Sequence, residues 1–153
     1  MAHLSMDTSN QEAMLEAAKK QLGYTDEQLA HIMSQPKFQK TLQLMPTPEF
    51  RNTTLVIEVV EVHGCSEGMK VGDKLYFTGM ALLDTKRSDN WCGYALSNLG
   101  MFVFTCHNMM LNGIDPNLMY SNHTHCFDAG CKYGLGHVIM KAYTIKEDLV
   151  PED

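Results

Sequence analysis

The stretch Thr53–His63, TTLVIEVVEVH, decides the fold. Valine, isoleucine and threonine make up most of it, and such β-branched residues are typical of a β-strand. A turn that contains glycine follows, and Lys74–Gly79, KLYFTG, then predicts a second strand. Near the end of the chain, Gly136–Ile145, GHVIMKAYTI, predicts a third strand. We therefore expect a small, mainly antiparallel sheet.

The segment Trp91–Leu111 lies between the second and third predicted strands and predicts one long helix. It contains no proline, and apolar side chains recur along it at helical spacing. One face would carry Leu96, Leu99, Val103, Cys106 and Met110. Gly113 and Pro116 then disfavour continuation of the helix. The expected fold is therefore α+β, with the small sheet packed on one central helix.

Residues 1–52 predict a helical arm that precedes this core. Residues Asn10–Leu22 are rich in good helix formers. Thr25 and Gln28 fit a capping box at the start of a second helix, and Pro36 suits the first turn of a third. The apolar stripes of these helices are too thin to form an independent core, so the arm must pack on something else.

Two interpretations of the arm stay open. It is either a lid on the same chain or a docking arm for a protein partner or a second subunit of a homo-oligomer. The expected domain plan is an arm over residues 1–52, an α+β core that carries the cysteines over residues 53–146, and a solvated acidic tail over residues 147–153.

Composition argues against two classes of partner. The formal net charge is −6 and basic residues never cluster beyond a pair, so the positive field that attracts nucleic acid is missing. No apolar run reaches the ~20 residues that cross a bilayer, and the first residues lack the pattern of a secretory signal. We expect a cytoplasmic protein that binds neither nucleic acid nor membranes.

The five cysteines are an odd number, and a reducing cytoplasm disfavours a disulfide framework, which leaves metal ligands or reactive thiols. The segment Ser121–Cys131, SNHTHCFDAGC, concentrates possible ligands: His123, His125, Cys126 and Cys131. Thiolates and imidazoles can hold zinc or, where thiolates predominate, an iron–sulfur cluster. The spacing alone is a weak-to-moderate signal, because the chain lacks the paired C-x2-C arrangement of a typical site.

Helix geometry separates the other cysteines. In one continuous helix, Cys92 and Cys106 lie ~21 Å apart at ~1.5 Å per residue, too far to share a metal. Cys92 begins the helix, where the macrodipole favours a thiolate, whereas Cys106 falls on the apolar face as a core residue. Cys65 follows the first strand, so Cys65, Cys92 and the loop cysteines Cys126 and Cys131 can meet at one end of the sheet.

Four stretches resemble a family of small uncharacterised bacterial and archaeal proteins, many of them from anaerobes: VIEVVEVHGCSEGMKVGDKLYF, WCGYAL, CFD and VIMKAY. The family pattern is a strand that ends in Gly-Cys, a Gly-x-Lys-x-Gly-Asp turn, a Cys-Pro-x-Ala helix start and a late Cys-x-Asp. The resemblance covers roughly Leu55–Tyr143. The pattern falls on Gly64, Cys65, Gly68, Val71, Gly72, Asp73, Cys92, Ala95, Cys126 and Asp128.

This chain departs from the family pattern at a few positions. Gly93 stands where the family usually has proline, and Cys131, His123 and His125 are additional. The resemblance implies no particular activity. It selects the same three cysteines, at positions 65, 92 and 126, that helix geometry leaves available.

The leading hypothesis is a small metal-binding protein with a thiolate-rich site. The thiolate ligands would be Cys65, Cys92 and Cys126, and the fourth ligand would be Cys131, His125 or His123. An iron–sulfur cluster would indicate an electron-transfer or accessory subunit. Zn²⁺ would be structural or, with one position open, catalytic with Asp128 as a base.

Two alternatives remain. One is a thiol enzyme without metal, in which Cys92 is the nucleophile and a loop histidine is the base. The other is a partner-binding protein whose cysteines are simply buried. The sequence leaves open whether the protein is an enzyme.

Overall fold

The computed structural model describes residues 13, 15–17, 19, 20, 22–45, 47–79 and 81–147. Contacts divide the chain into two compact units, Met1–Pro46 and Thr47–Asp153. The short helix α4, Pro48–Arg51, belongs to the second unit, in which the Lys146 ammonium donates a hydrogen bond to the carbonyl of Glu49 at 2.7 Å. The second unit therefore begins before the strand that was expected to open it.

The first unit contains helices α2, Asp26–Met33, and α3, Pro36–Leu44. The predicted capping box is present, because the Gln28 amide donates to Thr25 Oγ1 at 3.2 Å and the Thr25 amide donates to Gln28 Oε1 at 2.9 Å. Neither helix buries a residue. Of the helix expected over residues 10–22, positions 13, 15–17, 19, 20 and 22 are helical, and the others lie outside the described residues.

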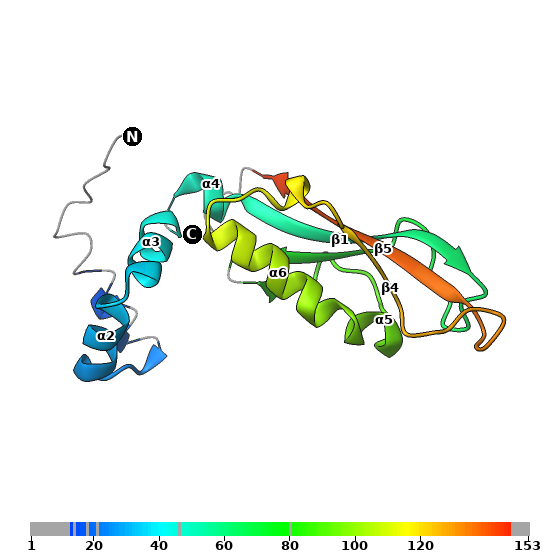
Figure 1. Cartoon of the computed structure of the whole chain (residues 1–153), viewed down its shortest axis with the longest axis horizontal. Coiled ribbons are helices and arrows are strands. Elements are labelled where there is room, and N and C mark those ends of the chain that lie inside the picture. The colour runs from blue at the N-terminus through cyan, green and yellow to red at the C-terminus, as the bar shows by residue number, and fades with distance from the viewer. Residues whose placement is uncertain are drawn as a thin grey trace. The chain divides into compact units, whose positions relative to one another are not determined.

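The second unit is built on a five-stranded sheet in the order β3-β2-β1-β5-β4 (Figure 1). Its strands are β1, Thr53–His63; β2, Lys74–Thr78; β3, Leu82–Leu83; β4, His123–His125; and β5, His137–Lys146. All neighbouring strands are antiparallel. This arrangement confirms the predicted α+β class, and β1 has the predicted bounds.

Two of these strands were not predicted. β3 has two residues, and β4 has three and lies inside the segment 121–131 that was interpreted as a loop. β4 pairs with the middle of β5, with His125 opposite Ile139. Three residues are too few for an alternating pattern to show in the sequence, so the tertiary pairing with β5 is what makes this segment a strand.

The single helix expected over Trp91–Leu111 is wrong, because two helices take its place: α5, Gly93–Ser97, and α6, Leu99–Leu111. They meet at Asn98, whose side-chain amide donates to Thr124 Oγ1 at 3.2 Å and to the backbone carbonyl of His125. The break therefore lies where α5 and α6 are tied to β4. A contact with a distant strand ends the first helix.

The core lies between one face of the sheet and these helices (Figure 1). On α6, Leu99, Cys106 and Met110 are buried, as the predicted apolar face requires, whereas Leu96 on α5 is exposed. The sheet residues that belong to this core are Leu55, Ile57, Val59, Leu75, Val138, Met140 and Ala142. Within the described residues, no helix is long and apolar enough to cross a membrane.

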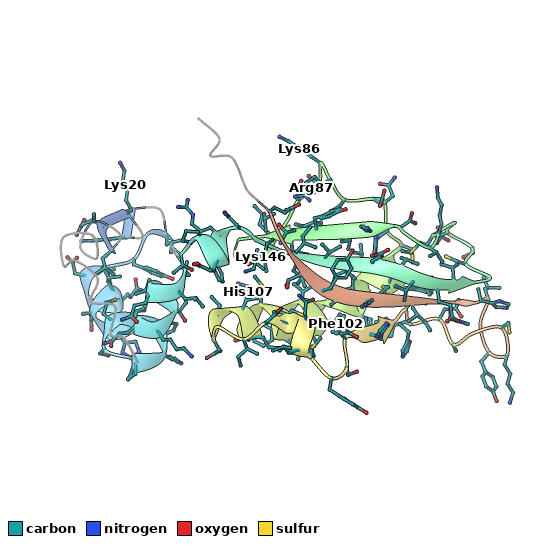
Figure 2. All side chains as sticks on the ribbon, turned by 90° about the horizontal axis from the view of Figure 1, so that it is seen from above. Lys20, Lys86, Arg87, Phe102, His107 and Lys146 are labelled. Atoms are coloured by element: carbon teal, nitrogen blue, oxygen red, sulfur yellow. The ribbon has the colours of Figure 1, made fainter. Side chains whose placement is uncertain are left out.

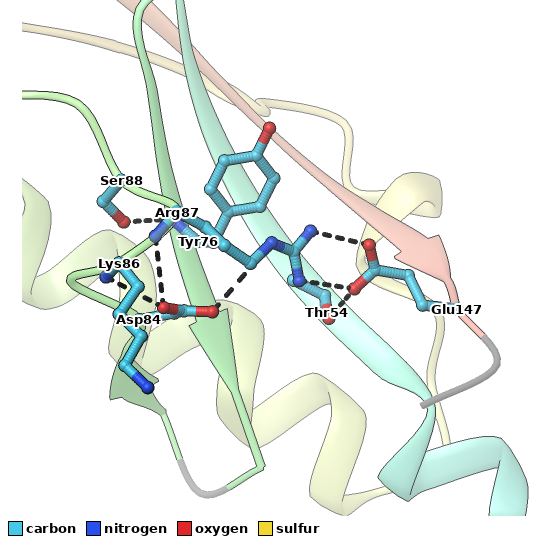
Figure 3. A network of polar contacts seen from close by, with 7 residues as sticks. All are labelled: Thr54, Tyr76, Asp84, Lys86, Arg87, Ser88 and Glu147. Atoms are coloured by element: carbon cyan, nitrogen blue, oxygen red, sulfur yellow. Dashed lines mark hydrogen bonds and ion pairs between the residues drawn. The ribbon is translucent and has the colours of Figure 1, made fainter. Parts of the chain in front are cut away.

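The opposite face of the sheet is covered in part by a polar network (Figure 3). Arg87 lies over the ring of Tyr76, with its guanidinium carbon 4.3 Å from the ring centroid, whereas the neighbouring Lys86 extends away from the sheet (Figure 2). The Glu147 carboxylate accepts hydrogen bonds from Arg87 and from the buried Thr54 hydroxyl. The solvated tail predicted from residue 147 is therefore wrong at Glu147, and residues 148–153 lie outside the described residues.

Candidate functional site

A pocket of about 610 Å³ lies at the end of the sheet where β1 finishes and β5 begins. Its lining comes from the turn after β1, the start of α5, the segment after β4 and the first residues of β5. These segments are far apart in the sequence. The antiparallel pairing of β1 with β5, and the contact of α5 with β4, bring them together.

Three of the predicted ligands, Cys65, Cys92 and Cys126, line this pocket. Cys65 follows Gly64, a glycine with φ 65° in the turn after β1. Cys92 directly precedes α5, and Cys126 directly follows β4. Cys65 and Cys92 are partly exposed, and Cys126 is buried. The prediction that these cysteines lie near one end of the sheet therefore agrees with their positions.

Cys126 is held in place by β5. Its backbone amide donates to the carbonyl of Val138 at 3.0 Å, and the Val138 amide donates to the Cys126 sulfur at 3.3 Å. The sulfur thus has a backbone hydrogen-bond donor directed at it. A donor of this kind suits a sulfur that carries negative charge.

Cys92 was expected to begin a long helix, but the helix that follows it is short. α5 has five residues, so the dipole expected from a helix that continued to Leu111 is absent. The partial exposure of Cys92 and its place in the pocket remain. These two observations, rather than a helix dipole, make Cys92 a candidate site residue.

The predicted fourth ligands do not line the pocket. Cys131 is exposed. On β4, Thr124 pairs with Met140, a core residue on the helix-covered face, so the alternation of a strand directs His123 and His125 to the outer face. The Nδ1 atom of His125 donates to the backbone carbonyl of Cys126 at 2.6 Å.

Asp128 lines the pocket, but its carboxylate organises the loop before β5. The carboxylate accepts hydrogen bonds from the Gly130 amide at 3.2 Å and from the Leu135 amide at 3.1 Å. The chain packs tightly here, because a Cβ added at Gly134 would stand 1.9 Å from Asp128 Oδ1. These contacts indicate that Asp128 stabilises the loop, and they favour this structural role over the predicted role as a catalytic base.

Two aromatic residues, Trp91 and Tyr94, also line the pocket. Trp91 packs partly buried against the core, and Tyr94 is exposed. Trp91 Nε1 is buried and has no hydrogen-bond partner among the described residues. Together the two side chains place apolar surface beside the thiols.

Cys106 lies apart from the pocket. It is fully buried on α6, and burial raises the pKa of its thiol to about 11. The neighbouring residue His107 projects from α6 (Figure 2). Partial burial lowers the pKa of its imidazole. The prediction that Cys106 is a core residue is confirmed.

The sequence reasoning missed three residues beside the pocket: Glu61, His63 and His137. His63 on β1 lies opposite His137 on β5, and His137 Nε2 donates a hydrogen bond to Glu61 Oε1 at 2.9 Å. Glu61 and His63 are two residues apart on a predicted strand, so a shared face could have been inferred. Their proximity to His137 depends on the register of β5, which the sequence does not reveal.

Comparisons of this chain with known protein families, with curated proteins and with solved structures find no match. The resemblance to the family of small cysteine-containing proteins therefore stays a prediction, and the function has to be argued from the site itself.

Proposed function

We propose that the protein holds an iron–sulfur cluster in the pocket through the thiolates of Cys65, Cys92 and Cys126. The observation that carries this proposal is that three cysteines from three separate segments line one pocket. Cysteine thiolates are the usual protein ligands of such clusters. A pocket of about 610 Å³ offers room for a polynuclear centre.

A cluster and a single zinc ion require different distances between the three thiols. Two thiolates on one zinc ion, each bonded at ~2.3 Å, bring their sulfurs within about 4 Å of each other. Among the described residues, no three His, Cys, Asp or Glu side chains are grouped closely enough to hold a metal ion, so the thiols would have to move closer together for either kind of centre. The ligand sulfurs of a cluster stand further apart, and metal binding is commonly coupled to local folding, so the thiols can close on it.

The surroundings of Cys126 support the proposal further. The Val138 amide already donates to the Cys126 sulfur, and hydrogen bonds to the ligand sulfurs are one means by which a protein tunes such a cluster. Trp91 and Tyr94 contribute aromatic surface beside the proposed ligands. The role that suits a cluster in a chain of this size is electron transfer or service as an accessory subunit.

The proposal is tested on the full-length protein purified anaerobically, by iron and acid-labile sulfide analysis together with an absorption spectrum. We expect iron and sulfide in the wild type and their loss in Cys65→Ser, Cys92→Ser and Cys126→Ser. Cys106→Ser is the matched control, because it makes the same chemical change outside the pocket and should retain the iron.

Several outcomes would contradict the proposal. Zinc without sulfide would replace the cluster by a single-ion site, and a metal-free protein with one rapidly alkylated thiol would favour a thiol enzyme. Iron that survives all three pocket substitutions would place any cluster elsewhere. Cys131→Ser decides the fourth ligand: loss of iron assigns it to Cys131, and retention assigns it to a group outside the protein.

A further inference from the structure

A second group of possible ligands lies on the opposite face of the same end of the sheet. His63 on β1 and His137 on β5 are direct cross-strand partners, so their side chains share a face. Val138, the next residue, is buried in the core against the helices, so the imidazole of His137 belongs to the outer face. This face therefore presents two imidazoles on adjacent strands, of which His137 also belongs to the lining of the pocket that holds the thiols.

The two rings are close to the separation that a shared metal ion requires. Their centroids are 5.7 Å apart and their planes differ by 24°. An imidazole nitrogen binds a metal at ~2.1 Å, and the ring centre lies about 1 Å beyond that nitrogen, so two rings on one ion have centroids roughly 5–6 Å apart. The two rings are stacked, and the exposed His63 side chain would turn for both rings to face one ion.

A hydrogen bond to Glu61 orients the ring of His137. The Oε1 atom of Glu61 lies 2.9 Å from His137 Nε2, an arrangement in which Nε2 donates the hydrogen bond and Nδ1 is left with a free lone pair. Metal-binding histidines characteristically donate their second ring N–H to a carboxylate or a carbonyl, which fixes the tautomer and the ring orientation. The outer face thus supplies both the ligand and its orienting partner.

We propose that His63 and His137 together bind a divalent transition-metal ion on the outer face of the sheet, with Glu61 as the residue that positions His137. Imidazole nitrogens suit Zn²⁺, Ni²⁺, Cu²⁺ and Co²⁺. The chain supplies two ligands here, and water would complete the coordination. The inference is independent of the cluster proposed in the pocket.

Titration of the full-length protein with Co²⁺ tests this site, because cobalt reports its ligands. NMR spectra of the histidine ring protons should show shifts for His63 and His137 at the first additions of metal, while His31 in α2 is unaffected. Binding at the imidazoles should develop without the sulfur-to-cobalt charge-transfer absorption that binding at the thiols would produce. Calorimetry then gives the affinity.

Substitutions distinguish the proposed metal ligands from a histidine that is not expected to bind the metal. His63→Asn and His137→Asn should each weaken Co²⁺ binding at this site at least 10-fold, and Glu61→Gln should weaken it by 10–100-fold, as loss of an orienting partner does. His123→Asn is the matched control, because it removes another exposed imidazole from the same face, opposite Lys141 on β5, and should have no effect.

The inference is overturned if the His63 and His137 signals stay in place at saturating Co²⁺. It is also overturned if His63→Asn and His137→Asn bind Co²⁺ as tightly as the His123→Asn control. An unchanged affinity in Glu61→Gln would remove Glu61 from the proposal and leave the histidine pair.

Discussion

Replacing Glu147 with alanine should destabilise the protein, although the sequence assigns this residue to a solvated tail. The carboxylate accepts hydrogen bonds from Arg87 Nη1 at 2.9 Å, from Arg87 Nη2 at 2.6 Å and from Thr54 Oγ1 at 2.6 Å (Figure 3). Thr54 is 0% exposed in the intact protein, and the Glu147 carboxylate is the partner to which its hydroxyl donates. The network joins the start of β1, the loop after β3 and the end of β5.

The magnitude follows from these contacts. A buried hydroxyl left without a partner costs about 1–3 kcal/mol. The ion pair with Arg87 is partly exposed and adds no more than about 1 kcal/mol. The sum is roughly 1–4 kcal/mol, which at about 4 °C per kcal/mol for a domain of this size lowers Tm by roughly 4–16 °C.

Urea and thermal unfolding followed by circular dichroism measure this loss in Glu147→Ala. Glu67→Ala is the control, because it removes the same charge from an exposed position in a turn. In a Thr54→Val background the buried hydroxyl no longer exists, so the cost of Glu147→Ala should fall to about 1 kcal/mol or less. Equal stabilities of Glu147→Ala and Glu67→Ala, or an unchanged cost in the Thr54→Val background, would refute the reasoning.

The same residue sets a pH window. The hydrogen bonds from Arg87 lower the pKa of Glu147 below its ordinary value of 4.5 in the folded chain. The stabilisation is therefore complete above pH 4.5 and is lost as the pH falls through the lower folded value. The difference in stability between the wild type and Glu147→Ala should shrink over that range.

Four further predictions follow from single positions. Cys106→Ser should cost about 1–3 kcal/mol in urea unfolding, because a hydroxyl replaces a fully buried thiol. Cys106 should react last of the five cysteines with iodoacetamide in mass spectrometry, because burial raises its pKa to about 11, and the exposed Cys131 should react early. Gly136→Ala should cost about 1–3 kcal/mol or more in the same unfolding assay, because its Cβ would stand 2.0 Å from the carbonyl oxygen of His63. Stability should fall as the pH drops below 6.5, the ordinary pKa of histidine, because burial lowers the pKa of His107 in the folded chain, and His107→Leu should flatten that part of the pH profile.

The elements that the sequence predicts well are those whose signal is local. β1 has the predicted bounds because its β-branched residues favour an extended chain wherever they pack. The start of α2 is likewise predicted, because the capping box of Thr25 and Gln28 is formed by residues three apart. In both cases the residues that specify the element belong to it.

The elements that the sequence misses depend on partners elsewhere in the chain. Asn98 separates α5 from α6 while its side chain bonds to β4, and β4 is a strand because β5 lies beside it. Glu147 looks like part of an acidic tail until Arg87 and Thr54 are seen around it. None of these pairings has a short-range signature, so pattern reading alone could not find them.

Strand alternation places the proposed ligands of the two candidate sites on different faces of the sheet, although His137 also lines the pocket of the thiols. In the sequence, the four residues HTHC at positions 123–126 look like one cluster of metal ligands. Consecutive residues of an extended chain point to opposite faces of the sheet, so the side chains of Cys126 and His125 are not expected to bind the same metal centre. The same rule divides Val138, buried in the core beside Cys126, from His137 on the outer face. The cysteines proposed as ligands of the cluster thereby lie on the face beside the helices, and the histidines proposed as ligands of the second metal lie on the outer face. Loss of a thiol should then leave the imidazole site intact, because the two sets of ligands share no residue.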